Sequence, residues 1–311
     1  DDVQSMVRFL LYSNEFDVEG LIASAATSSF IADKDNILYM LDLYDQVDEN
    51  LRTHDPDYPT ADYLRSVTYQ GMGNEGPINI QWNCSNGHWS DIIGSGRDSE
   101  ASDAIIAAGD RNDPRPIYIG CWGGPREVAQ AIWKVQNTRS PAEADEFIGK
   151  LRLFLIHCQD ATNQWLMDVP DLFVVWSRTA YQGMFGVGNQ SNGDLQWTTN
   201  NIINNHGPLC ALYPDYDYQN NSCGVREGDS PSFMWLLSAN RGINNPEDPT
   251  QPSWGGTYDP IPGKNNKYGG PDHQGPASSI TQWADDFQPL FAERADWCLD
   301  DTAAVTGKEV D

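Results

Sequence analysis

Residues 116–132, PIYIGCWGGPREVAQAI, decide the fold class of this chain. A compact β-branched run at 116–121 is followed by the turn Trp122–Gly124 and then by a helical pattern with Pro125 in its first turn. Two more apolar runs without alternation follow, LRLFLIH at 151–157 and LFVVW at 172–176. Such strands, separated by helices, are typical of a parallel sheet covered on both faces. The sequence therefore predicts an α/β fold, a doubly wound, mostly parallel sheet with helices on both faces.

Regular patterns extend outward from this segment. The apolar residues between 3 and 11 recur at helical spacing, and a short strand-like run follows at 17–24. Further helices are predicted at 33–51, 60–70, 98–108, 194–204, 230–238 and 283–298. Long loops separate the last three, but no repeat and no break in composition divides the chain. We therefore expect a single domain over residues 1–311.

The chain is strongly acidic, since 45 acidic and 19 basic side chains give it a net charge of −26. Such a surface repels phosphate backbones and anionic lipid headgroups, and the sequence contains no basic patch. No run of about 18 apolar residues occurs, as a transmembrane helix would require. We therefore expect neither a nucleic-acid partner nor a membrane partner. Long loops rich in Asn, Asp, Gly and Pro, with more Arg than Lys, favour a secreted, extracellular protein.

Six cysteines and three glycosylation sequons also bear on the compartment. No CxxC pair is present, so a structural zinc site is not expected. Cys210 and Cys223 flank a polar loop, and we predict a disulfide across it, as is common in secreted proteins. Asn83, Asn189 and Asn220 are predicted glycosylation sites, although such sequons also arise by chance in a chain rich in Asn.

Polar groups at the carboxyl ends of the strands define the candidate site, because ligands of doubly wound sheets bind there. The acids Asp1, Asp2 and Asp229, together with carbonyl groups of the Gly-Gly turn, suit a hard cation such as Ca²⁺. Each of these acids also opens a helix-like segment, where an ordinary N-cap is the alternative interpretation. Composition and spacing leave both interpretations open.

Several motifs occur in one order along the chain: DDVQSMVRFLLYSNEFDVEGLIASAAT (1–27), GSGRDSEASDAII (94–106), IYIGCWGGPREVAQAI (117–132), EGDSPSF (227–233) and SWGGTY (253–258). Together they resemble the nucleoside hydrolase-like domain of the secreted cellulose-binding protein family. The resemblance spans essentially the whole chain and implies the fold of the inosine-uridine nucleoside hydrolases. Members of this family commonly continue into an immunoglobulin-like β domain, which we do not expect within residues 1–311.

The resemblance also implies roles for single residues. Asp1 and Asp2 match the last two acids of an aspartate-rich motif, so Asp2 would be a calcium ligand and Asp1, as a catalytic residue, would lie against the sugar hydroxyls. The carbonyl of Trp122 and the carboxylate of Asp229 would complete the ligands of Ca²⁺. The first acid of that motif, which resembles the family's water-activating base, would lie upstream of Asp1. We therefore expect the first strand and the start of the motif to precede residue 1 in a longer precursor.

The pocket for the substrate departs from that of true nucleoside hydrolases. Ser28 and the segment Gln159–Asn163 occupy the places of their ribose-binding Asn and Glu-Phe-Asn residues. Hydroxyl recognition could survive with Asp160 and Asn163, whereas ribonucleoside specificity is not expected. His157 ends a strand and is either a pocket residue or a core histidine. The predicted substrate-binding residues are Ser28, His157, Gln159, Asp160 and Asn163.

Two functions of different class follow. The first is a secreted, calcium-dependent glycosidase-like hydrolase that directs water at an anomeric carbon of a glycan or an N-glycoside. The second is a non-catalytic carbohydrate-binding or structural glycoprotein that retains the fold. Cytosolic purine salvage fits the departures in the ribose site poorly. The expected partner is a carbohydrate or glycoside ligand, and the sequence leaves the oligomeric state open, a homo-oligomer included.

Overall fold

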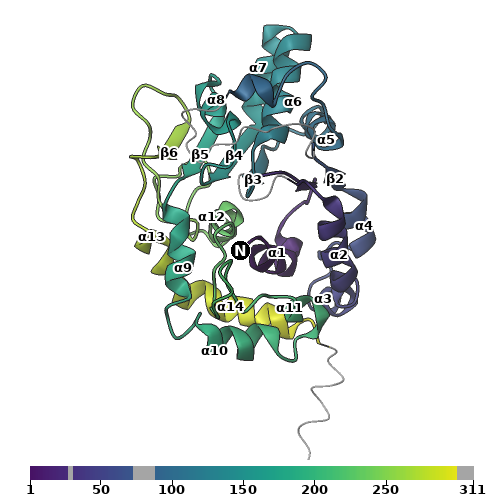
Figure 1. The fold of residues 1–311 in the computed structure, drawn as a ribbon, viewed down its shortest axis with the longest axis vertical. Coiled ribbons are helices and arrows are strands. Elements are labelled where there is room, and N and C mark those ends of the chain that lie inside the picture. Colours follow the sequence, from purple (N-terminus) through teal and green to yellow (C-terminus); the bar gives the residue numbers. More distant parts are fainter. Residues whose placement is uncertain (27–30, 73–87, 300–311) are drawn as a thin grey trace, which may run out of the picture.

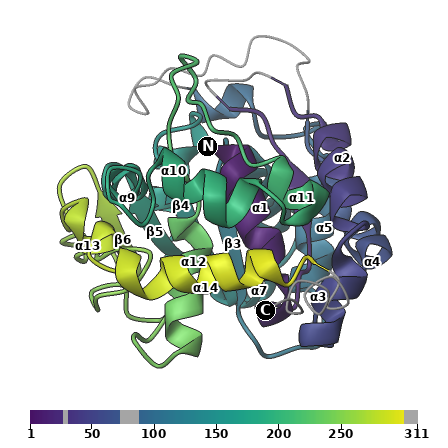
Figure 2. The ribbon, with the colours of Figure 1, turned by 90° about the horizontal axis from the view of Figure 1, so that it is seen from below.

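The computed structural model describes residues 1–26, 31–72 and 88–299 (Figures 1 and 2). Its main sheet has four parallel strands in the order β3 (Ile117–Cys121), β4 (Leu151–Ile156), β5 (Phe173–Ser177) and β6 (Lys267–Gly270). A second parallel pair joins β1 (Leu21–Ala23) to β2 (Thr68–Gln70). The predicted α/β class with parallel strands is confirmed. The strands described here form two sheets, whereas the sequence predicted one.

Helices cover both faces of the main sheet, as predicted (Figure 1). One face packs against α6 (Arg126–Thr138), α7 (Pro141–Lys150) and α8 (Thr162–Asp168), and the other against α12 (Pro231–Asn240). The side chains of β4 divide between the two faces by strand alternation. Leu153 and Leu155 pack in the cluster with α6 to α8, while Phe154 and Ile156 pack with Trp235 of α12. Apolar side chains on both faces explain why this strand reads as an unbroken apolar run.

A second hydrophobic cluster lies beside the main sheet. Its helices are α1 (Asp2–Leu11), α2 (Lys34–Tyr44), α3 (Asp48–His54), α4 (Ala61–Ser66), α11 (Gly207–Ala211) and α14 (Ala284–Asp296). Val7 and Leu10 of α1 and Phe291 of α14 are fully buried in this cluster. Figure 2 shows α14 crossing α1 and ending near α3. None of the helices in the described ranges is long and apolar enough to cross a membrane.

The remaining helices and helical turns complete the described part of the chain. They are α5 (Glu100–Gly109), α9 (Gly183–Val187), α10 (Leu195–Thr198), α13 (Ser278–Thr281), η1 (Ser13–Glu15), η2 (Trp89–Asp91), η3 (Ala180–Gln182) and the π-helical turn η4 (Thr199–Ile203).

Two predicted helices are broken by tertiary pairing and turns. The helix predicted at 60–70 ends at Ser66, and residues 68–70 form β2, whose neighbour Val67 accepts a hydrogen bond from the backbone N–H of Leu21 at 2.9 Å. Pairing with β1 satisfies the backbone there, and the β-branched Val67 and Thr68 suit it. The helix predicted at 33–51 divides into α2 and α3.

Strand β3 is less buried than its apolar sequence suggests. Its residues are half-buried, and Gly120 is exposed. Within the described residues β3 pairs with β4 on one edge only, and its other edge borders a large cleft. A further parallel strand could pair at this edge, and the strand predicted upstream of Asp1 stays a prediction.

The structure does not contain the predicted disulfide between Cys210 and Cys223, and both residues are free thiols in it. Cys210 is fully buried at the end of α11, where its Sγ lies 3.9 Å from Sγ of Cys298. Cys223 is half-buried in the polar loop, and its backbone N–H is bonded to the carbonyl of Asp215. The two side chains therefore belong to different environments. Of the predicted glycosylation sites, Asn189 and Asn220 are exposed, and Asn83 lies outside the described residues.

Candidate functional site

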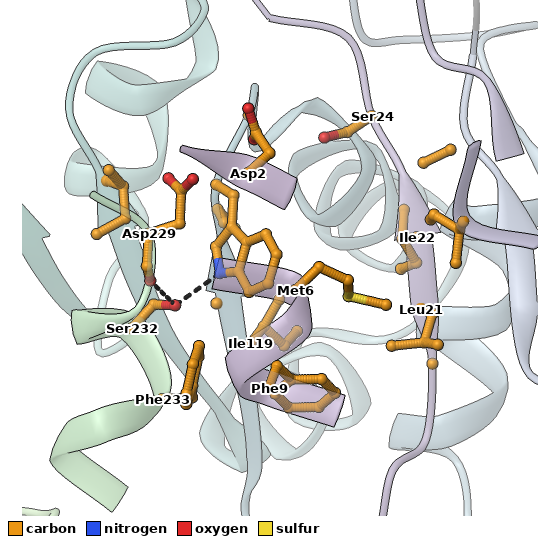
Figure 3. Close-up of a pocket in the computed structure, with 18 of the residues that line it drawn as sticks. Asp2, Met6, Phe9, Leu21, Ile22, Ser24, Ile119, Asp229, Ser232 and Phe233 are labelled. Atoms are coloured by element: carbon orange, nitrogen blue, oxygen red, sulfur yellow. Dashed lines mark hydrogen bonds between the residues drawn. The ribbon is translucent and has the colours of Figure 1, made fainter. Parts of the chain in front are cut away.

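A cleft of about 2270 Å³ opens between α1, the turn after β3 and the loop after β4. Asp1 and Asp2 enter it from the start of α1, Trp122 from the turn, and Asp229 from the loop before α12. Figure 3 shows Asp2 and Asp229 at the same end of this pocket. The site therefore lies where a parallel sheet binds ligands, at the carboxyl ends of its strands.

The structure brings Asp1, Asp2 and Asp229 together. One carboxylate oxygen of each lies within 4.8 Å of those of the other two. Asp1 and Asp2 are exposed, whereas Asp229 is only 3% exposed, and its Oδ2 has no hydrogen-bond partner within the described part of the chain. Burial, and then the negative charge of Asp2, raises the pKa of Asp229 well above its ordinary value. Three converging carboxylates with an unpaired buried oxygen suit a hard cation.

Neither Asp1 nor Asp229 caps a helix with its side chain. Asp1 stands at the N-cap position of α1, but its side chain makes no capping hydrogen bond among the described residues. Asp229 precedes Ser230, the N-cap residue of α12, and accepts bonds from Ser232 through its backbone carbonyl. The N-cap interpretation is thus wrong for these two acids, and their carboxylates remain available to a ligand.

A buried ion pair joins α1 to the segment that carries Asp229. Glu227, which is fully buried, accepts hydrogen bonds from Nε of Arg8, from Nη2 of Arg8 at 2.9 Å, from Tyr213 at 2.7 Å and from Ser230 at 2.6 Å. Arg8 also donates to Gln288 of α14 at 2.7 Å. Since Arg8 lies two turns below Asp1 and Asp2, this network fixes their helix relative to Asp229.

Gln4 strengthens the same connection. Its amide nitrogen donates to the carbonyls of Pro214 at 2.6 Å and Gly224 at 3.1 Å, and its oxygen accepts from the backbone N–H of Arg226 at 2.6 Å. Three backbone groups of the loop are thereby satisfied by one side chain of α1. The first turn of α1 and the loop before α12 are therefore held in one arrangement.

Gly228 lets the backbone of the loop before α12 lie close to the side chain of Asp1. A Cβ at this position would lie 2.6 Å from Oδ2 of Asp1, 3.3 Å from the Tyr181 ring and 3.4 Å from the Phe185 ring. The two rings, from η3 and α9, meet edge to face with centroids 5.9 Å apart. The guanidinium of Arg226 lies 4.4 Å from the centroid of the Phe185 ring. An aromatic wall thus stands directly beside the carboxylates.

The turn after β3 is held from both sides. The backbone N–H of Gly124 donates to the carbonyl of Ala25 at 2.9 Å, and a Cβ on Gly124 would lie 2.6 Å from that oxygen and 2.3 Å from Asp160. The indole N–H of Trp122 donates to Ser232 at 2.7 Å, and Ser232 donates to the carbonyl of Asp229 at 2.6 Å (dashed lines in Figure 3). The Trp122 turn and Asp229 are therefore linked through one serine.

His157 and Gln159, two of the predicted substrate-binding residues, line the cleft. Gln159 donates to the carbonyl of Trp122 at 3.0 Å, the same oxygen that is predicted as a metal ligand. His157 adopts a left-handed backbone with φ of 58° and lies beside Tyr181, with ring centroids 5.8 Å apart. Burial lowers the pKa of His157, which favours its neutral form.

Asp160 and Asn163 are buried behind the cleft, and Ser28 lies outside the described residues. Asp160 accepts hydrogen bonds from Thr162 and from the backbone N–H of Arg126, and burial raises its pKa to about 6. Asn163 accepts from the backbone N–H groups of Gln159 and Asp160. Both side chains thus shape the loop after β4. Their predicted contact with substrate stays a prediction.

Sequence reasoning missed the aromatic wall and the buried ion pair. Tyr181 and Phe185 are four residues apart directly after a strand, which is a signal for one helical face. Glu227 stands two residues before Asp229 in the motif EGDSPSF. A glutamate next to a predicted ligand could have been weighed as its support, but its partner Arg8 lies 219 residues away in the chain.

The parallel α/β fold and the converging acids agree with the nucleoside hydrolase-like class that the sequence motifs resemble. The family described as "Cellulose-binding Sde182, nucleoside hydrolase-like domain" matches residues 1–258, and the chain belongs to this family. It is also similar to a solved structure from Saccharophagus degradans, described as a nucleoside hydrolase-related hypothetical protein associated with carbohydrate metabolism. That similarity has 31% identity and a TM-score of 0.77, and covers 96% of this chain and 69% of the other. No curated protein matches the chain significantly.

Proposed function

We propose that this chain is a secreted, calcium-dependent glycosidase-like hydrolase that acts on a glycan or an N-glycoside. The observation that carries the proposal is the convergence of Asp1, Asp2 and Asp229 within 4.8 Å in the cleft. Three negative charges at this spacing repel one another, and burial of Asp229 increases the cost. A bound divalent cation would offset that repulsion and would satisfy Oδ2 of Asp229.

Asp2, Asp229 and the carbonyl of Trp122 are the residues that would hold Ca²⁺. When bound, Ca²⁺ supplies a positive charge that attracts vicinal sugar hydroxyls and lowers the pKa of a coordinated water. Asp1, the third acid of the cluster, is exposed and would accept hydrogen bonds from sugar hydroxyls and orient the ring. Tyr181 and Phe185 would pack against the apolar face of the same sugar. Gln159 holds the Trp122 carbonyl in position.

The proposed ligand class is supported by the relatives as well as by the cleft. The family description names cellulose binding, and the description of the solved relative names carbohydrate metabolism. Extracellular location is supported by the exposed sequons at Asn189 and Asn220 and by the net charge of −26, which keeps a protein soluble. The alternative is a non-catalytic carbohydrate-binding protein, which the same aromatic wall and family description favour.

The first experiment is a calcium titration by calorimetry, with Asp229→Asn as the test variant and Asp145→Asn as the control. Asp145 is exposed on α7 and lies outside the cleft, so its substitution removes the same charge elsewhere. We expect Ca²⁺ to bind the wild type and the control, and its affinity to fall at least tenfold in Asp229→Asn. A wild type that binds no Ca²⁺ would refute the metal site.

The second experiment separates hydrolase from binding protein. Release of reducing sugar is measured on soluble cello-oligosaccharides and on a panel of nitrophenyl glycosides, with Ca²⁺ and with a chelator. Release that the chelator abolishes, and that Asp1→Ala lacks while still binding Ca²⁺, would support the hydrolase. Binding of these sugars without release would support the non-catalytic alternative.

A further inference from the structure

The cysteine pair at the end of α14 lies outside the cleft and has no role in the proposed function. Cys210 lies in α11 and Cys298 follows α14, and both side chains are buried, with exposures of 0% and 2%. Their sulfur atoms are 3.9 Å apart, although 88 residues separate them in the chain. Tertiary packing alone therefore brings the two thiols into contact.

The surroundings hold both cysteines in place. The backbone carbonyl of Cys298 accepts a hydrogen bond from Asn50 of α3 at 2.9 Å. The neighbouring Trp297 stacks on His54 of α3, with ring centroids 5.1 Å apart and planes inclined by 6°. Gly207, at the start of α11, has φ of 82°, and a Cβ there would lie 3.7 Å from Cβ of Cys298. The facing backbones of α11 and the end of α14 are thus closely packed.

We propose that Cys210 and Cys298 form a disulfide in the mature protein. A disulfide needs the sulfur atoms at about 2.05 Å, so the two side chains must close by roughly 2 Å, which small rotations of both can supply. Each thiol gives up one proton and one electron as the S–S bond forms, and a disulfide oxidant such as oxidised glutathione is reduced to two thiols. The inference rests on the extracellular compartment proposed above and not on catalysis.

The disulfide would form during folding and would then be buried away from reductants. The contact with Cys210, together with burial, raises the pKa of Cys298 well above its ordinary value. Thiolate is the form that attacks a disulfide, so the thiols in the reduced folded protein react slowly. In the unfolded chain both thiols are accessible and have ordinary pKa values. Refolding in a redox buffer should therefore produce the bond faster than oxidation of the folded, reduced protein.

The test is a peptide map of the whole chain refolded with reduced and oxidised glutathione. The protein is denatured with iodoacetamide and digested without reduction. Trypsin and a protease that cleaves after acidic residues separate Cys210 from Cys223, because Asp215 and Asp217 lie between them. We expect a linked peptide pair that contains Cys210 and Cys298 and is absent after treatment with dithiothreitol.

A second measurement uses thermal unfolding. Because the bond closes a long loop, we expect oxidised Cys298→Ser to melt roughly 5 °C below the oxidised wild type. Oxidised Cys223→Ser, the control, should melt as the wild type does. Alkylation of both Cys210 and Cys298 in the refolded protein, or a peptide that links Cys210 to Cys223, would overturn the proposal. Loss of calcium binding or of sugar release would leave it unaffected.

Discussion

Replacement of Glu227 by Gln tests whether the buried ion pair holds α1 against the loop that carries Asp229. The substitution keeps the shape of the side chain but removes its charge. Arg8, which is fully buried, then lacks its counterion and retains only neutral acceptors such as Gln288. Breaking a buried pair on one side typically costs about 3–5 kcal/mol. Since Gln can still accept some of the four hydrogen bonds, we expect the free energy of unfolding to fall by an amount near the lower end of this range, about 3 kcal/mol.

Two comparisons separate charge from packing. The double variant Arg8→Met with Glu227→Gln removes both charges. Its loss of unfolding free energy should therefore be smaller, by at least about 2 kcal/mol, than the summed losses of the single variants Arg8→Met and Glu227→Gln. Glu100→Gln is the surface control, because Glu100 pairs with Lys34 at 3.0 Å while its side chain is 47% exposed. Exposed pairs contribute about 0–1 kcal/mol, and the control should lose no more than that.

The assay is equilibrium unfolding in urea, followed by tryptophan fluorescence and far-ultraviolet circular dichroism. Coincident transitions would justify a two-state free energy of unfolding. In thermal scans a loss of 3 kcal/mol corresponds to roughly 5 °C for a chain of this size. A loss below about 1 kcal/mol in Glu227→Gln, or additive losses in the double variant, would refute the reasoning.

Three further substitutions address the cleft. Gly228→Ala places a methyl group where Oδ2 of Asp1 lies 2.6 Å away and should displace this carboxylate, so release of reducing sugar should fall at least tenfold while calorimetry still shows Ca²⁺ binding. Gly149→Ala, which meets no atom within 4 Å, should behave as the wild type does in both assays. Asp160→Asn tests the raised pKa of Asp160, about 6 in the folded protein against about 3.9 when unfolded. Protonation favours the fold, so this stabilisation is full below the unfolded pKa and disappears as the pH rises through 6. The unfolding free energy of the wild type relative to Asp160→Asn should fall by about 2 kcal/mol between pH 4 and 7 in urea titrations, and a flat difference would contradict the assignment. Trp122→Phe removes the hydrogen bond to Ser232 and should lower the free energy of unfolding by about 1 kcal/mol, whereas an unchanged midpoint in urea would mean that this bond contributes nothing.

Much of the fold was predictable because its signals are local. The runs at 117–121, 151–156 and 173–177 are strands, and the amphipathic pattern after Asp1 is α1. Residues 68–70 were expected to be helical and form β2 instead, because pairing with β1 lies outside any local window. The half-buried state of β3 was not predictable either, since it depends on which of its edges is paired.

The sequence alone determined the α/β class, the family resemblance and the three acids Asp1, Asp2 and Asp229. Helical and strand periodicities are local, and a motif can be recognised without knowledge of its neighbours. Only the tertiary structure decided that these acids converge, that Arg8 and Glu227 fix their helix, and that Cys210 lies beside Cys298. The physical reason is that these contacts join residues far apart in the chain, and the packing of α1, α11, α12 and α14 creates them.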